Sequence, residues 1–170
     1  MPYLRGKGLD LGCGAEKVLE TEHCIGIDNN KDLALFNIPA KFDIKADVEK
    51  LDMFADGKMD WVFSSHALEH FPYEQVPAIL REWFRVVRVG GHIALYLPDM
   101  DQYPKCIDPL AGILVPEPHV NTDHKWNVSY ERVVEAAKKA YPAWDLRYFE
   151  KCAAEDEYSL FFAFQKLKWN

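Results

Sequence analysis

The chain has 170 residues, a length that fits a single domain (1–170) with a substantial buried core. Its formal net charge of −7 disfavours a broad phosphate-binding face, so no nucleic-acid partner is expected. The cysteines show neither C-x-x-C pairing nor metal-ligand spacing, and no signal peptide or membrane span is recognisable, so we expect a cytoplasmic protein with free thiols and no membrane contact.

A glycine-rich turn follows the first predicted strand, residues 7–11. Residues 9–14 (LDLGCG) end an apolar run in an acidic residue and two glycines, which is typical of a parallel strand that turns into a helix, here expected over 15–22. Gly12 suits a backbone conformation closed to other residues, and Gly14 allows close approach of a ligand. The turn is therefore predicted to form the floor of a binding site.

The charges around this turn indicate which ligand it binds. A dinucleotide site needs a third glycine, but Lys17 occupies that position. Glu16, in the expected helix's first turn, would repel a bound diphosphate, and Asp10 suits a cationic group better than an anion. A ligand with positive charge and no phosphate fits, and S-adenosylmethionine, with its amino group and sulfonium, meets that description.

The Asp-x-Gly-x-Gly element of residues 10–14 resembles motif I of the class I S-adenosylmethionine-dependent methyltransferases, in particular small type 11-like domains. The resemblance covers 7–97 by motifs in the family's order and 128–168 by pattern alone. It implies an α/β, doubly wound, Rossmann-like sheet of about seven mostly parallel strands, the last antiparallel, with helices on both faces.

The remaining elements follow in an order that agrees with this fold. Further strands are predicted at 24–28, 42–46, 59–63, 92–97, 144–150 and 158–167, the last two joined around 154–156. Helices are predicted at 31–37, at 76–87 (an apolar stripe ended by Gly90 and Gly91) and from the N-cap Ser129 to Ala140. The irregular stretch 99–128 is expected to be a lid or substrate loop.

Two carboxylates at strand ends are predicted to hold the cofactor. Asp28 suits the two ribose hydroxyls, although an aspartate before two asparagines also favours a plain turn. By resemblance, Asp47 accepts the adenine amine and Val48 offers its N–H, while a helix N-cap is the alternative for Asp47. The segment after the fourth strand, residues 64–70, resembles the family's segment that lines the cofactor's methionine end. The predicted cofactor site therefore comprises Asp10, Gly12, Cys13, Gly14, Asp28, Asn29, Asp47, Val48, Ser64 and Ser65.

Histidines supply the candidates for catalysis. His66 and His124 are predicted as possible general bases, and His66, Asp99, His119 and His124 as substrate contacts. His119, Asp123 and His124 lie close together in the chain, but their spacing matches no standard metal motif, so no metal is expected.

These patterns favour methyl transfer from S-adenosylmethionine to an oxygen or nitrogen of a small polar molecule, such as a saccharide or other metabolite. A non-catalytic S-adenosylmethionine-binding accessory module is the first alternative. A nicotinamide-dependent oxidoreductase is the second, and the missing third glycine counts against it. A small-molecule substrate is the expected partner, and oligomerisation stays open.

Overall fold

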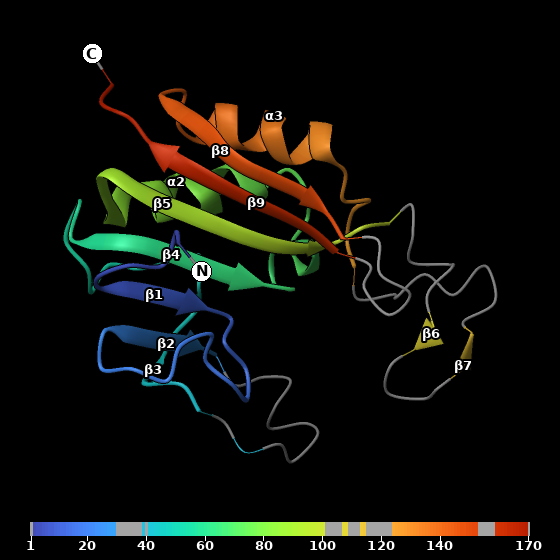
Figure 1. Cartoon of the computed structure of the whole chain (residues 1–170), viewed down its shortest axis with the longest axis horizontal. Helices are drawn as coiled ribbons and strands as arrows, with labels where there is room; N and C mark the ends of the chain where they lie inside the picture. The colour runs from blue at the N-terminus through green and yellow to red at the C-terminus, as the bar shows by residue number, and fades with distance from the viewer. Residues whose placement is uncertain are drawn as a thin grey trace.

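One mixed sheet organises the chain in the computed structural model, which describes residues 2–29, 39, 41–100, 107–108, 113–114, 124–152 and 159–169. Seven strands within this part of the chain pair in the order β3-β2-β1-β4-β5-β9-β8 (Figure 1). Their bounds are β1 Gly8–Leu11, β2 Cys24–Asp28, β3 Ile44–Lys45, β4 Met59–Ser65, β5 Val87–Pro98, β8 Trp144–Lys151 and β9 Ser159–Lys166. The final strand, β9, runs antiparallel to both its neighbours, which confirms the predicted sheet.

The sheet order brings the ends of β1, β2 and β4 together. β1 pairs in parallel with β2 on one side and with β4 on the other. In parallel α/β sheets, ligands bind beyond the carboxyl ends of the strands. The glycine turn after β1, Asp28 at the end of β2 and Ser65 at the end of β4 therefore face one region.

Two helices cover one face of the sheet, α2 (Val76–Val86) and α3 (Tyr130–Ala140), both behind it in Figure 1. The apolar stripe of α2 buries Ile79, Leu80 and Trp83, as the three- and four-residue spacing predicts. The hydroxyl of Ser129 accepts a hydrogen bond from the N–H of Arg132, which confirms the predicted N-cap.

Two local predictions are wrong. Residues 15–22 form turns and bends rather than a helix, because the N–H of Val18 donates to Asp10 Oδ2 at 2.6 Å instead of to a backbone carbonyl. Gly90 and Gly91 do not end α2: the chain becomes extended at Val87, and both glycines lie within β5. The predicted helix 31–37 and the turn around 154–156 lie outside the described residues.

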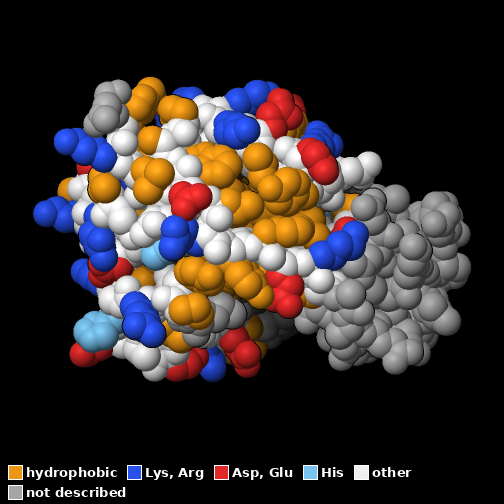
Figure 2. All heavy atoms as spheres, turned by 45° about the horizontal axis from the view of Figure 1, so that its top comes forward, with side chains coloured by type: hydrophobic (Ala, Val, Ile, Leu, Met, Phe, Trp, Pro, Cys, Tyr) orange, Lys and Arg blue, Asp and Glu red, His pale blue; other side chains and the backbone are white. Residues whose placement is uncertain are grey.

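On the opposite face the described residues place no helix. Leu4 of the N-terminal segment packs there with Trp61, Phe63, Ala94 and Phe161. Figure 2 shows hydrophobic side chains gathered on the surface seen from this side, and Tyr148 of β8 is 40% exposed. The two-residue strands β6 (Ile107–Asp108) and β7 (Ile113–Leu114) pair within the predicted substrate loop, most of which lies outside the described residues. None of the described helices is long and apolar enough to cross a membrane.

Candidate functional site

The glycine turn after β1 is held by its neighbours in a shape that glycine permits. Gly12 and Gly14 have φ angles of +73° and +59°. The N–H of Gly12 donates to the carbonyl of Ile27 at 2.8 Å, and that of Gly14 donates to Asp28 Oδ2 at 3.0 Å. A Cβ on Gly12 would lie 2.9 Å from the Cβ of Ala67, so the turn also approaches the segment after β4.

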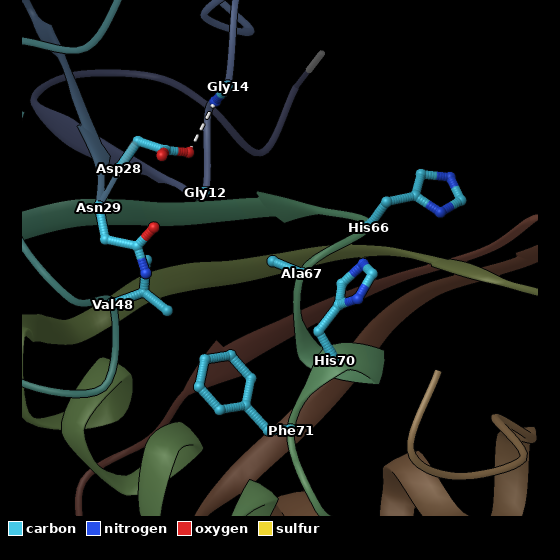
Figure 3. A pocket seen from close by; sticks show the side chains of 9 residues that line it. All are labelled: Gly12, Gly14, Asp28, Asn29, Val48, His66, Ala67, His70 and Phe71. Atoms are coloured by element: carbon cyan, nitrogen blue, oxygen red, sulfur yellow. Dashed lines mark hydrogen bonds between the residues drawn. The ribbon is translucent and has the colours of Figure 1, made fainter. Parts of the chain in front are cut away.

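A cavity of about 220 Å³ lies between this turn and the segment after β4. Figure 3 shows Asp28 and Gly14 at one end of it and His66 and His70 at the other. Five predicted cofactor residues line it, together with His66 and three residues that were not predicted. The full lining is Gly12, Gly14, Asp28, Asn29, Val48, His66, Ala67, His70 and Phe71. The cavity thus has a carboxylate at one end and imidazoles at the other.

A second hollow of about 320 Å³ shares Gly12 with the first. It is lined by three further predicted cofactor residues, Asp10, Cys13 and Ser65, together with Glu16, Lys17, Val18 and Phe63. The two hollows lie on either side of the glycine turn. An extended ligand fits such a divided site better than a compact one.

Asp10 gives the second hollow its electrostatic character. Its side chain is 2% exposed, and this burial raises its pKa from the ordinary 3.8 to about 6, although the hydrogen bond from Val18 opposes the shift. At neutral pH the protein therefore holds a buried carboxylate at an energetic cost. A cationic ligand group would offset that cost, which agrees with the predicted positive charge of the ligand.

Replacing Asp10 with Asn should stabilise the ligand-free protein at neutral pH. Below about pH 3 both folded and unfolded chains carry a neutral Asp10, so the substitution has little effect there. As the pH rises from about 4 to about 6, the unfolded chain is ionised while the folded chain still holds a neutral Asp10, and the wild type loses up to about 3 kcal/mol of stability, which Asn avoids while still accepting from Val18. Urea denaturation of both proteins between pH 4 and 8 measures the difference, and a gap that does not grow with pH would contradict it.

Three other predicted cofactor residues have different surroundings. Burial raises the pKa of the Cys13 thiol to about 12, and Asp10 and Asp28 add to the shift. The thiol therefore stays protonated at neutral pH, and Cys13 would contact a ligand through its backbone. The Ser64 hydroxyl is buried and donates to the carbonyl of Leu11 at 2.9 Å. Asp47 lies outside the cavity lining and accepts a hydrogen bond from the side chain of Asn29 at 3.1 Å.

His66 has a strained backbone and a tightly held ring. Its φ of +48° is rare for any residue with a side chain, and such strain concentrates at functional sites. The ring lies between two polar groups, with Nδ1 3.2 Å from Glu69 Oε1 and Nε2 3.2 Å from the Ser159 hydroxyl. Because a carboxylate only accepts, Nδ1 carries the proton in the neutral ring and Nε2 is left as the acceptor.

The structure describes two of the other predicted residues, Asp99 and His124. Asp99 is buried just beyond β5 and forms a 2.8 Å ion pair with Lys151. His124 lies beside Glu69, with Nε2 3.9 Å from Oε1. His119 and Asp123 lie outside the described residues.

Sequence reasoning missed two residues that hold His66. Glu69 follows it by three residues, and that spacing was a usable signal for a contact across one helical turn. Ser159 is 93 residues away in the chain, and only the pairing of β9 with β5 brings it near, so no local pattern points to it.

A family profile described as a methyltransferase domain matches residues 9–95. The chain belongs to this family. A search of curated protein sequences gave no match. The matched segment of the methyltransferase domain contains both hollows and His66.

Solved structures similar to this methyltransferase domain cover nearly all of it. A SAM-dependent methyltransferase from Archaeoglobus fulgidus aligns with a TM-score of 0.68 and 21% identity over 97% of this chain and 89% of its own. One from Methanosarcina mazei gives 0.66 and 18% over 98% and 95%, and one from Mesorhizobium loti gives 0.61 and 16% over 98% and 94%. At these identities the likeness establishes a shared fold.

Proposed function

We propose that this protein uses S-adenosylmethionine to methylate an oxygen or nitrogen of a small polar molecule, such as a saccharide. The observation that carries the proposal is a cavity beside the glycine turn that has Asp28 at one end and the strained His66 at the other. The buried carboxylate of Asp10 supports a ligand that brings its own positive charge. S-adenosylmethionine has that charge.

S-adenosylmethionine supplies a methyl group on a positively charged sulfur, which leaves as a neutral thioether when an acceptor lone pair attacks the methyl carbon. Asp28 positions the ribose, and the glycine turn positions the remainder of the ligand. His66 Nε2 accepts the proton that the acceptor's hydroxyl or amine loses, while Glu69 holds Nδ1–H. The Ser159 hydroxyl lies 3.2 Å from Nε2 and would have to turn aside for that transfer.

Substituting His66 with Asn should separate this function from the non-catalytic alternative. Asn tolerates a positive φ, so the fold should persist, but the proton acceptor is lost and turnover should fall by about 10²- to 10⁴-fold. The measurement is S-adenosylhomocysteine formation with a panel of monosaccharides, amines and hydroxy acids.

Affinity for S-adenosylmethionine should change little in this variant, and His23→Asn, at an exposed histidine, is the matched control. Tight cofactor binding by the wild type with no turnover on any acceptor would favour the accessory-module alternative.

A further inference from the structure

We propose that Glu69, His70 and His124 form a binding site for a divalent transition metal such as Zn²⁺. One ligand atom from each of these side chains lies within 4.8 Å of the other two. Atoms bound to a single tetrahedral ion lie roughly 3.4 Å apart, given metal–ligand bonds of about 2.1 Å. A side-chain rotation of His70, which is exposed, would bring its ring nitrogen closer to the other two ligand atoms.

The carboxylate of Glu69 is the strongest indication of a cation site. Its side chain is fully buried, and Oε1 lies within 3.2 Å of His66 Nδ1. The second oxygen, Oε2, is also buried, and no described residue donates a hydrogen bond to it. A buried carboxylate oxygen without a donor is costly, and a bound cation is one of the few groups that compensates it.

The backbone holds the two parts of the site together in advance. Glu69 and His70 belong to a short 3-10 helix, η1 (Leu68–His70), while His124 lies near the C-terminal end of the predicted substrate loop, 99–128. The N–H of Lys125 donates to the carbonyl of Glu69 at 2.7 Å, and the Trp126 indole donates to that of Leu68 at 3.1 Å. These two hydrogen bonds fix His124 beside η1, so an ion would meet a largely preformed site.

The donor set fixes the chemical class of the ion. Two imidazoles and one carboxylate suit Zn²⁺, Fe²⁺ and Co²⁺ better than Mg²⁺ or Ca²⁺, which prefer oxygen ligands. The contact of His66 with Glu69 Oε1 orients the carboxylate from outside the ligand set. Exposure of His70 leaves room for a water molecule or an acceptor's oxygen as a further ligand.

The site adjoins the methyl-transfer region, since His70 also lines the cavity of about 220 Å³ with His66. A metal role in holding the acceptor rests on the proposed function, whereas metal binding itself does not. The sequence predicts no metal because the spacing of His119, Asp123 and His124 matches no standard metal motif. The partners that the structure gives His124 come from a segment more than fifty residues earlier.

Titration of the metal-free protein with Co²⁺, and in competition with Zn²⁺, tests this site directly. We expect one equivalent to bind, with visible absorption bands typical of a low-symmetry Co²⁺ site and a rise in melting temperature. His70→Ala should weaken binding by more than the roughly 10- to 100-fold that loss of an outer-shell partner costs. Because His70 is exposed, this variant should fold normally, and Glu69→Gln provides a second removal of a ligand.

His23→Ala, at an exposed histidine remote in sequence, should bind Co²⁺ like the wild type. Equal binding by the wild type and His70→Ala, or an intense near-ultraviolet thiolate band that places the ion on cysteine, would overturn the proposal. S-adenosylmethionine affinity is measured separately on the same samples. Lost cofactor binding with intact Co²⁺ binding counts against the proposed function alone, and the reverse counts against the metal site alone.

Discussion

Asp28→Ala should weaken binding of S-adenosylmethionine and S-adenosylhomocysteine by about 30- to 150-fold, or about 2–3 kcal/mol, as loss of a charged hydrogen-bonding partner does. The carboxylate ends β2 and lines the cavity from the side opposite His66 (Figure 3). Calorimetric titration of both ligands into wild type and variant measures the effect. Asp52→Ala, at an exposed carboxylate on the loop after Leu51, should bind as the wild type does.

Asp28 also holds the glycine turn, so Ala alone does not separate two roles. Its Oδ2 accepts from the N–H of Gly14 at 3.0 Å, and Asp28→Asn can keep that acceptor while losing the charge that two ribose hydroxyls require. We therefore expect Asp28→Asn to melt near the wild-type temperature and still bind the cofactor weakly. Wild-type affinity in Asp28→Asn would instead support the alternative interpretation, in which this aspartate only forms a turn.

Features set by short stretches of sequence were predictable. The Ser129 cap and the stripe of α2 depend on residues three and four apart, and both appear in the structure as predicted. The strand 24–28 and its terminal Asp28 were recognisable because an apolar run ended in a carboxylate next to the glycine turn. Local chemistry of this kind was enough to predict the glycine turn and the strand that ends in Asp28.

Features that depend on contacts between distant segments were not predictable. The local sequence of 15–22 is compatible with a helix. In the structure, however, the N–H of Val18 donates to the Asp10 carboxylate, and the Lys17 ammonium donates to Asp43 at 3.0 Å. The ring of His66 is likewise positioned by Ser159, which only the order of β5 and β9 brings near. The position of the His66 ring therefore depends on topology, whereas the glycine turn and Asp28 follow from local sequence motifs.

Trp83→Ala should lower the free energy of unfolding by about 3–5 kcal/mol, which is a large part of the 5–15 kcal/mol typical of a domain. The ring is fully buried between α2 and the sheet, so truncation leaves a cavity in the main core. Urea denaturation gives the value directly. Trp169→Ala is the matched control, because that ring is 64% exposed and its loss should change stability by less than about 0.5 kcal/mol.

Trp83→Phe tests how this core supports the cofactor site. The indole N–H of Trp83 donates to the carbonyl of Val48 at 2.8 Å, and Val48 lines the cavity beside Asn29. Phe keeps most of the packing but leaves that buried carbonyl without its donor, at a cost of about 1–3 kcal/mol. Because Val48 is freed to move, cofactor affinity should fall as well, whereas a core that only supplies stability would leave the affinity of the folded protein unchanged. Affinity measured well below the melting temperature distinguishes a role of the Trp83–Val48 hydrogen bond in ligand binding from a role in stability alone.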